Sequence, residues 1–582
     1  MKKNPKVSII IPVYNGKDFM KEAIDSALAQ TYDNIEILVV NDGSNDNNAT
    51  RNIALEYGDK IKYFEKNNGG VSTALNLALT KMSGDYFSWL SHDDRYYPNK
   101  ISDQIDLLKN YDDFTILYSD YDLMDENSNI FAKSIKDHEE LVSKPEYGLL
   151  RGSINGITLL IPKKAFEVCG NFREDLRCTQ DYELWYRMMQ KFKFVHQPGI
   201  LATTRLHKNQ TGNTSPKVLK ENNELWIDLI EGFSDKTKIK LENSVYNYYY
   251  QMREFIKTTN FDGTLRYLDD KISTMDDDFK KKSEDMLVSV VIPFYNNLNE
   301  LKRAVSSVLN QTHKKFEILI IDDCSNCRIP KNEFNFDNIK IFYNNKNMGP
   351  SYSRNVGIKN SNGDFIAFLD SDDEFLPNKL ENELLFLLKN CADFCFTSYV
   401  RRTSIDTNID CNCDFKFIKL KCISNCVIAT PTVMINKKIL LDNSILYNED
   451  IKFGEDVIFY LNIFKYTNPF FLNEYLTIVY SESDSAYIDI NKQIEGTKNI
   501  LRFLLNDNYY KKYNNDIAKL CYGLYSLVSP NINEYNVPVS PGPNSSNNES
   551  VNISKLKKIY ITLKNKGFAY CLKRFCKKIV GK

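Results

Sequence analysis

The sequence lacks the features that mark membrane-spanning, secreted and nucleic-acid-binding chains. No apolar run reaches the roughly 20 residues that a membrane-spanning helix needs. The first residues, Met-Lys-Lys-Asn-Pro, lead directly into a strand-like run without the apolar segment of a signal peptide. Lys and Arg number 75 and Asp and Glu 76, so the net charge of −1 offers no general attraction to nucleic acid. We therefore expect a cytoplasmic protein without a nucleic-acid partner, whose 13 cysteines are thiols rather than disulfides.

What the sequence does contain is a duplication. At 582 residues the chain is too long for one hydrophobic core. The run Val7 to Asn15 recurs with few changes at Val288 to Asn296, and the run Ile35 to Ser44 recurs at Phe316 to Ser325. Because the order is the same in both halves, the chain holds two copies of one domain rather than a solenoid of short repeats.

Strand-like and helix-like segments alternate within each copy. In the first copy, Lys17 to Gln30 carries apolar residues at helical spacing, Ile35 to Val40 is a buried strand, and Thr73 to Lys81 is a short helix. The second copy follows the same scheme, with a helix over Asn299 to Gln311. This alternation predicts an α/β fold with a parallel sheet in each copy.

An acidic motif is the clearest part of the duplication. Tyr86 to Lys100 and Phe365 to Lys379 each begin as an apolar run and continue with acids, aromatics and Pro-Asn-Lys. Parallel sheets usually bind ligands at the carboxyl ends of their strands. Clustered carboxylates repel one another without a cation, and hard oxygen ligands suit Mg²⁺ or Mn²⁺. We therefore expect a metal site after each of these strands, with a solvated acidic turn before a helix as the alternative.

The ends of the two copies differ from the rest in composition. The stretch 217–285 is polar and helical, and Ser529 to Ser550 is rich in Pro, Asn and Ser, as linkers are. Lys555 to Lys582 has ten Lys or Arg and no acid, with apolar residues at roughly helical spacing. Such a basic amphipathic helix favours the surface of an anionic membrane. A C-terminal helix packed on the protein, with its basic residues in water, is the alternative.

The motifs, taken in order, resemble those of the family 2 glycosyltransferases, which have the GT-A fold. The shared motifs are the Val-Ser-Ile-Ile-Ile-Pro-Val-Tyr-Asn opening, Asn-Asp-Gly-Ser, the acidic motif and a later Gln-Asp or Glu-Asp. The resemblance covers about Lys6 to Asn213 and Val288 to Ile490, and it implies two tandem, Rossmann-like GT-A domains. The predicted parts are GT-A domain 1 over 1–215, a helical connector over 216–285, GT-A domain 2 over 286–500, a helical segment and linker over 501–550, and the basic tail over 551–582.

The resemblance implies a nucleotide-sugar site in each copy. Tyr14 and Tyr295 follow the first strand, where a ring can lie against a nucleobase. Asp42 and Asp323 end the second strand, where a carboxylate can accept from a base N–H or a ribose hydroxyl. Packing for the tyrosines and a turn aspartate for Asp42 are the alternatives. The residues expected to bind the nucleotide-sugar are Pro12, Tyr14, Asp42, Asn68, Arg205, Pro293, Tyr295, Asp323 and Arg354.

The acidic motif is the expected place of Mn²⁺ or Mg²⁺, which would offset the charge of the diphosphate leaving group. The predicted ligands are Asp93, Asp94, His207, Asp370, Asp372 and Asp373. The first copy has Ser91 in place of the first acid. The two copies also differ in the expected diphosphate contact, which is Arg205 in the first copy and Arg354 in the second. These differences suggest different donors.

A later carboxylate in each copy is the expected general base. Asp181 follows Thr179-Gln180, and Asp456 follows Glu455, each at the start of a helix-like run. A base at this place can take the proton of the acceptor hydroxyl during direct displacement, so no covalent nucleophile is required. Glu455 is expected to share the role in the second copy. A helix N-cap is the alternative for each aspartate.

These expectations describe a bifunctional inverting glycosyltransferase. It would transfer sugars from nucleotide-sugars, with UDP-sugars favoured, to a growing capsule or lipopolysaccharide chain on a glycan or lipid-linked acceptor. The tail would hold it at the inner face of the cell membrane. A single-activity enzyme with one degenerate module is the alternative, and a non-catalytic glycan- or nucleotide-binding scaffold is a third possibility.

Overall fold

The computed structural model of the chain describes residues 4–207, 216–326, 328–330, 332–403, 406–409, 411, 428–480 and 490–513. The chain divides into two compact units, which we call unit 1 (Met1–Asp276) and unit 2 (Asp277–Lys582). The basic tail over 551–582, the predicted linker Ser529 to Ser550 and most of the helical segment before it lie outside the described residues. The domain boundaries expected from the sequence remain a prediction.

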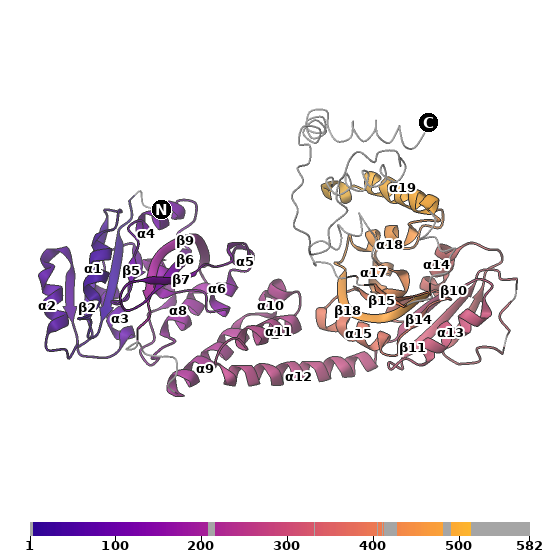
Figure 1. The fold of residues 1–582 in the computed structure, drawn as a ribbon, viewed down its shortest axis with the longest axis horizontal. Helices are drawn as coiled ribbons and strands as arrows, with labels where there is room; N and C mark the ends of the chain where they lie inside the picture. The colour runs from indigo at the N-terminus through magenta and orange to yellow at the C-terminus, as the bar shows by residue number, and fades with distance from the viewer. Residues whose placement is uncertain are drawn as a thin grey trace, which may run out of the picture. The chain divides into compact units, whose positions relative to one another are not determined.

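Unit 1 is built on a five-stranded sheet in the order β3-β2-β1-β4-β8 (Figure 1). The central strand β1 (Val7–Val13) is buried along its whole length and pairs in parallel with β2 (Ile35–Asn41) and β4 (Tyr86–Trp89). β3 (Lys62–Glu65) extends the parallel sheet, and β8 (Ile161–Pro162) closes the other edge antiparallel to β4. The predicted α/β fold with a mainly parallel sheet is confirmed.

Helices cover both faces of this sheet, because successive side chains of β1 point to opposite faces. Ile9 belongs to one hydrophobic cluster with α1 (Met20–Leu28) and α4 (Lys100–Leu108), and Ile10 belongs to another with α3 (Val71–Lys81). The other helices of this part are α2 (Ala49–Glu56), α5 (His138–Ser143), α6 (Glu146–Leu150), α7 (Lys163–Cys169) and α8 (Gln180–Met189).

A second, four-stranded sheet in unit 1 receives the chain directly after the acidic motif. Its order is β5-β9-β6-β7. The long strands β6 (Thr115–Met124) and β9 (Lys193–Arg205) are parallel to each other, and the short β5 (Arg95–Tyr96) pairs antiparallel with the end of β9. β7 (Ile130–Ser134) lies at the far edge. The end of β9 is therefore held next to the acidic motif, although the two are far apart in the sequence.

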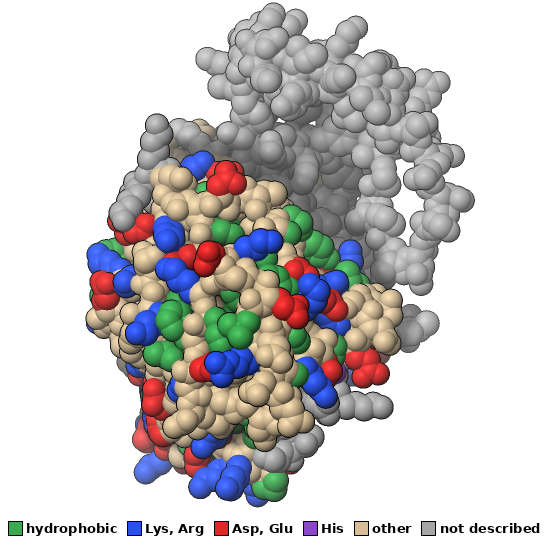
Figure 2. Space-filling view, turned by 90° about the vertical axis from the view of Figure 1, so that its left-hand side faces the viewer, with side chains coloured by type: hydrophobic (Ala, Val, Ile, Leu, Met, Phe, Trp, Pro, Cys, Tyr) green, Lys and Arg blue, Asp and Glu red, His purple; other side chains and the backbone are tan. Residues whose placement is uncertain are grey.

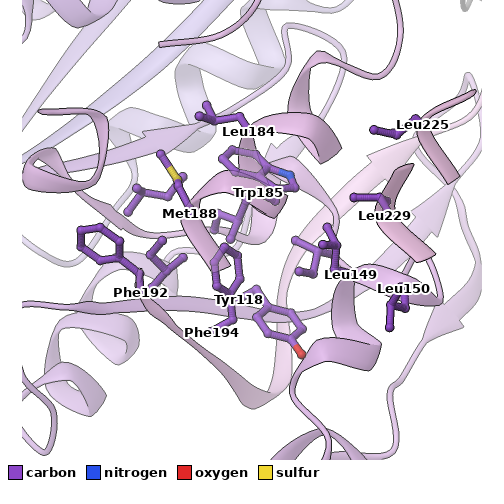
Figure 3. Close-up of a cluster of buried hydrophobic side chains, with 14 of the residues drawn as sticks. Tyr118, Leu149, Leu150, Leu184, Trp185, Met188, Phe192, Phe194, Leu225 and Leu229 are labelled. Carbon is purple, nitrogen blue, oxygen red and sulfur yellow. The ribbon is translucent and has the colours of Figure 1, made fainter. Parts of the chain in front are cut away.

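Helices that follow the second sheet complete the hydrophobic core of unit 1. α9 (Pro216–Gly232) places Leu225 and Leu229 beside Leu149 and Leu150 of α6, close to the group around Tyr118 and Trp185 (Figure 3). The helices after α9 are α10 (Asp235–Glu242), α11 (Val245–Ile256) and α12 (Asp262–Glu284). The stretch predicted to be a helical connector is thus helical, and all four of its helices contribute side chains to the core of the first module.

Unit 2 repeats the plan of unit 1. β10 (Val288–Phe294) pairs in parallel with β11 (Phe316–Asp322) and with β13 (Phe365–Phe368), in the same register as their counterparts in unit 1. Its sheet runs in the order β12-β11-β10-β13-β17-β15-β18-β14, with β16 on β15. The other strands are β12 (Ile339–Tyr343), β14 (Glu374–Phe375), β15 (Phe394–Arg402), β16 (Thr407–Ile409), β17 (Val433–Asn436) and β18 (Phe470–Tyr480). The helices are α13 (Leu298–Leu309), α14 (Pro350–Asn360), α15 (Lys379–Asn390), α17 (Lys437–Asp442), α18 (Glu455–Ile463) and α19 (Ile490–Asn506).

A buried glutamate ties the first strands of unit 1 together. Glu36 on β2 accepts from the Ser8 hydroxyl at 2.6 Å, from the Ser83 backbone N–H at 2.6 Å and from Lys62 Nζ at 2.6 Å. Burial raises the pKa of this carboxyl, but the bonds from Lys62, Ser8 and Ser83 outweigh it and lower the pKa to about 2. In unit 2, Glu317 makes the corresponding bonds, and its pKa is likewise lowered to about 2.

The surface carries charge of both signs. On the face shown in Figure 2, Lys and Arg side chains are interspersed with Asp and Glu, without a large area of one sign. Within the described ranges, none of the helices combines the length and the apolar character needed to cross a bilayer.

Candidate active site

The acidic motif of unit 1 lies at the carboxyl end of β4, between the two sheets. Asp94 is buried, and it accepts from the backbone N–H of Arg205 at 2.8 Å. Burial and the neighbouring Asp93 raise the pKa of Asp94 well above its usual value. Asp93 Oδ2 lies 3.1 Å from Nε2 of His207. The structure thus brings together Asp93, Asp94 and His207, three residues predicted for the metal site.

The side chain of Arg205 is fully buried and its donors are engaged within unit 1. Its Nε–H donates to the backbone carbonyl of Asp93 at 2.8 Å, and its Nη2–H donates to Glu22 Oε2 at 2.9 Å. Its guanidinium lies over the ring of Phe19, 4.4 Å from the centroid. These bonds join the backbone of the acidic motif to Arg205 and, through it, to helix α1. Binding of a phosphate by Arg205 stays a prediction, and it would require some of these bonds to be exchanged.

The acidic motif of unit 2 has the same backbone arrangement with different surroundings. Asp373 accepts from the backbone N–H of Tyr480 at 2.9 Å. Asp370 Oδ1 accepts from Nη2 of Arg354 at 2.7 Å. Burial and the charge of Asp370 raise the pKa of Asp372 to about 6. Nη1 of the same Arg354 lies 3.9 Å from Glu455, so the arginine stands between the motif and the predicted base.

The residues at each motif supply part of the ligand set of a divalent cation. Across the described residues, no three His, Cys, Asp or Glu side chains converge closely enough to form a complete site. Asp93 and His207 are nevertheless paired in unit 1, and in unit 2 desolvation and the charge of Asp370 raise the pKa of Asp372. Mg²⁺ typically takes only one or two protein carboxylates and completes its shell with water and substrate phosphates. A pair of protein ligands therefore suffices for such an ion.

The two predicted bases occupy matching helix starts. Asp181 lies in the first turn of α8, whose N-cap is Thr179, and Asp456 lies in the first turn of α18, whose N-cap is Gly454. Neither aspartate is therefore the N-cap residue that the alternative required. Burial raises the pKa of Asp181 to about 6 and also raises the pKa of Asp456. A carboxyl whose pKa approaches neutrality is better suited to general-base catalysis than an ordinary aspartate.

Glu455 is close to this base in unit 2. Burial and the charge of Asp456 raise the pKa of Glu455 to about 7. The corresponding residue of unit 1 is the neutral Gln180, just as Leu75 corresponds to Arg354 and Ser91 to Asp370. The correspondence of α3 and α14 rests on contacts, since Asn76 bonds to the backbone of Phe172 as Asn355 bonds to that of Tyr447. Unit 2 thus has a charged triple where unit 1 has three uncharged residues.

The predicted nucleotide residues divide into exposed and internally bonded groups. Tyr14 is 43% exposed and Tyr295 49%, so both rings are accessible for stacking. Asp42 instead accepts from the backbone N–H groups of Gly69 and Gly70 and from Lys66 Nζ. A contact of Asp42 with the nucleotide stays a prediction, because these bonds already occupy its carboxylate.

The other predicted nucleotide residues surround these two groups. Asp323 accepts from the backbone N–H groups of Met348 and Gly349, as Asp42 does from its own loop. Asn68 donates to the Asp42 carbonyl at 2.9 Å. Pro12 and Pro293 lie within β1 and β10, just before the exposed tyrosines. The two aspartates therefore order the loops that precede α3 and α14.

Sequence reasoning missed two residues that touch the acidic motifs. Glu22 on α1 is bonded to Arg205, and Arg303 on α13 donates to the backbone carbonyl of Asp372. Both lie in helices whose apolar spacing was the only signal considered. A position-by-position comparison of the two copies would have marked them, because one has a negative charge where the other has a positive one.

In sequence, the chain is similar to known glycosyltransferases. The sequence model described as glycosyl transferase family 2 matches residues 8–159 and 289–439. An uncharacterized glycosyltransferase of Rickettsia felis is 41% identical over 518 residues, which cover 88% of this chain and 85% of that protein. The UDP-Glc:alpha-D-GlcNAc-diphosphoundecaprenol beta-1,3-glucosyltransferase of Escherichia coli is 36% identical over 160 residues, covering 27% of this chain and 62% of that protein. Among solved structures, S. aureus TarS 1–349 is 22% identical with a TM-score of 0.35, covering 42% of this chain and 74% of that one.

Proposed function

The chain belongs to glycosyl transferase family 2 and is a glycosyltransferase, and from this premise we propose that it is bifunctional and inverting, with one transfer site in each unit. The observation that carries the proposal is the repetition of the acidic motif and of the helix-start aspartate in both units. Each unit places a buried carboxylate, Asp94 or Asp373, at the end of its fourth strand and an aspartate of raised pKa, Asp181 or Asp456, at a helix start.

The proposed reaction is a direct displacement at the anomeric carbon. The carboxylate of Asp181 in unit 1, or of Asp456 in unit 2, takes the proton of the acceptor hydroxyl as its oxygen bonds to the sugar. The bond to the nucleoside diphosphate breaks on the opposite side, which inverts the anomeric centre. A general base contributes about 10²- to 10⁴-fold to such a rate. Desolvation raises the pKa of Asp181 to about 6 and also raises the pKa of Asp456, so that each carboxylate accepts a proton more readily than an ordinary aspartate.

The acidic motifs are the proposed diphosphate sites. Mn²⁺ or Mg²⁺ would be held by Asp93 with His207 in unit 1 and by Asp370 with Asp372 in unit 2, and when bound it would offset the charge of the departing diphosphate. Asp94 and Asp373, which were also predicted as ligands, accept backbone N–H groups and anchor their motifs.

The proposed donors and acceptors follow from the relatives. The Escherichia coli relative is named for a UDP-sugar donor and a diphosphoundecaprenol-linked acceptor, which supports UDP-sugars and a lipid-linked acceptor for this chain. The glycan would be a surface polymer such as capsule or lipopolysaccharide. Two sites on one chain suit alternating addition, because the product of one transfer meets the other site at high effective concentration.

The two sites are proposed to use different donors. Arg354, Asp370 and Glu455 form a charged group in unit 2, and the corresponding residues of unit 1 are uncharged. The guanidinium of Arg354 adds hydrogen-bond donors for phosphate or sugar oxygens beside the motif of unit 2. In unit 1, such hydrogen bonds have to come from other residues.

Separate replacement of the two bases tests the proposal. D181N and D456N are to be compared in the full chain with a panel of UDP-, GDP- and CMP-sugars and a lipid-linked acceptor. Each is expected to lower one transfer about 10²- to 10⁴-fold and to spare the other. D235N, which removes an exposed first-turn acid of α10, is the matched control and should leave both intact. If one replacement abolishes all transfer and the other has no effect, the chain is a single-activity enzyme with one degenerate module, as the missing first acid at Ser91 would then indicate.

A further inference from the structure

Each unit holds its acidic motif with an arginine, but the arginine comes from a different element. In unit 1, Nε–H of Arg205 at the end of β9 donates to the backbone carbonyl of Asp93 at 2.8 Å. In unit 2, Nη2–H of Arg303 on α13 donates to the backbone carbonyl of Asp372. Asp93 and Asp372 are the same position of the duplicated motif. A guanidinium therefore reaches the same carbonyl from two different places in the chain.

Each of the two arginines lies at a position where the other unit has a different residue. The backbone N–H of Arg205 donates to Asp94, and the backbone N–H of Tyr480 donates to Asp373, the residue at the same place of the motif, so these two positions correspond. Arg303 lies as far after the start of β10 as Glu22 lies after the start of β1, so these two also correspond. Where one unit has the arginine, the other has a tyrosine or a glutamate.

The carboxylate partner of the guanidinium is transposed as well. Glu22 Oε2 accepts from Nη2 of Arg205 at 2.9 Å and lies 3.5 Å from Nη1 of Arg95, the first residue of β5. The residue that corresponds to Arg95 in unit 2 is Glu374, the first residue of β14, and its Oε1 lies 3.1 Å from Nε of Arg303. The ion pair between the first helix and the strand after the motif is thus present in both units with its charges reversed.

An aromatic ring completes the arrangement in both units. The guanidinium carbon of Arg205 lies 4.4 Å from the ring centroid of Phe19, and that of Arg303 lies 3.8 Å from the ring centroid of Tyr480. Both guanidinium groups therefore contact the motif carbonyl, a glutamate and a ring, and that of Arg205 also donates to the Asp125 carbonyl and to Ser128 Oγ. The arginine, the glutamate and the ring come from different positions in the two copies, yet the contact with the motif carbonyl is present in both.

We propose that Arg205 and Arg303 are positioning residues of the two acidic motifs, and that the motif requires a guanidinium at its backbone carbonyl rather than an arginine at a fixed position. A charge-assisted bond to the carbonyl of Asp93 or Asp372 fixes the turn that aims the neighbouring carboxylates. The consequence for catalysis rests on the proposed function of the motifs as diphosphate sites.

An exchange of residues between the units tests the inference. R205Y gives unit 1 the tyrosine of unit 2 without its arginine, and E22R/R95E/R205Y gives it the complete arrangement of unit 2. Hydrogen–deuterium exchange of the peptide over 91–97 measures the order of the motif without any substrate. R205Y should speed this exchange about tenfold or more, as expected for the loss of charge-assisted bonds, and the triple variant should bring it back to within about threefold of the wild type.

A matched control separates this effect from the general loss of an arginine. R151Y removes a guanidinium that is bonded to Glu140 at 2.9 Å and lies 3.9 Å from the ring centroid of Tyr147, away from the motif. Exchange over 91–97 should stay unchanged in this variant. The reciprocal variants R303E and R303E/E374R/Y480R provide the same comparison in the peptide over 370–376 of unit 2.

A second measurement links the order of the motif to its function. The Mn²⁺ concentration for half-maximal transfer should rise in R205Y and return toward the wild-type value in the triple variant. Unchanged exchange in R205Y would overturn the inference. The inference would also be overturned if hydrogen exchange in the triple variant were as fast as in R205Y while its tryptophan fluorescence stayed native. Rescue of exchange in a protein that transfers no sugar would count against the proposed function and leave the positioning role intact.

Discussion

Replacing Glu36 with Gln should destabilise unit 1 by about 2–3 kcal/mol at neutral pH. The buried carboxyl has its pKa lowered from 4.5 to about 2 by Lys62, Ser8 and Ser83, and each pH unit between the folded and unfolded values corresponds to about 1.4 kcal/mol. The product, about 3 kcal/mol, is an upper bound, because Gln can still accept from Ser8 and from the backbone. The loss of the charge opposite Lys62 accounts for most of the expected effect.

The chain provides both the probe and the control for this experiment. Its three tryptophans, Trp89, Trp185 and Trp226, are buried and all lie in unit 1. Urea unfolding followed by tryptophan fluorescence therefore reports on unit 1 alone. E36Q should lower the midpoint of this transition by about 1 M, given a typical dependence of 1–3 kcal/mol per molar urea. E317Q, the same change in unit 2, should leave the fluorescence transition in place and shift only the remaining transition seen by circular dichroism.

The pH dependence has a definite sign. A carboxyl whose pKa is lowered by folding stabilises the folded state above its unfolded pKa, and this stabilisation is lost as the pH falls toward the folded pKa. The difference between wild type and E36Q should therefore be constant above about pH 5 and shrink by about 1.4 kcal/mol for each pH unit below about 4.5. A difference below about 0.5 kcal/mol at pH 7, or one that is the same at pH 3 as at pH 7, would refute the charge-based reasoning.

Three further predictions concern the base, the core and the tail. Transfer by unit 1, measured as kcat/KM in a D456N background, should fall about tenfold per pH unit below about 6, because the carboxyl of Asp181 must be deprotonated to accept a proton; a flat profile between pH 5 and 7 would contradict this role. Leu229→Ala should cost about 2–5 kcal/mol in the same urea assay, because this α9 side chain is fully buried in the core of unit 1, whereas truncation of the exposed Leu55 should cost little. Deletion of residues 555–582 should release the protein from anionic vesicles but not change its sedimentation without lipid, and unchanged vesicle binding would rule out the membrane role of the tail.

The sequence predicted the parallel sheet and the main candidate residues because both depend on short patterns. Buried strands such as β1 are recognisable as apolar runs, and the acids at the end of β4 follow such a run directly. The contact between Asp93 and His207 could be expected only through the resemblance, since more than a hundred residues separate them. The bonds that Arg205 and Asp42 make within the fold could not be predicted from the sequence. Whether a side chain faces a ligand or is bonded within the fold depends on neighbours that sequence spacing does not reveal.

The helices after the second sheet illustrate the same limit. Apolar spacing in α9 predicts a helix, but it does not show that Leu225 and Trp226 pack against the core that contains Trp185. The polar composition of the segment led to its interpretation as the end of the first domain followed by a helical connector. A helix that contributes one apolar face to a core and a helix that joins two domains have the same pattern until their partners are known.

The transposed arginines also have a consequence for the evolution of the two copies. From the arrangement of unit 1, each single exchange disrupts it: R205Y removes the guanidinium at the carbonyl, E22R leaves arginines without their carboxylate, and R95E places two carboxylates beside one guanidinium. The effect of each substitution therefore depends on the residues already present at the other two, which is epistasis in its strict sense. Glu22 and Arg303 are homologous positions with opposite requirements. A substitution tolerated in one copy consequently does not predict tolerance in the other, and ancestral or consensus designs that average the two copies should fail at this place first.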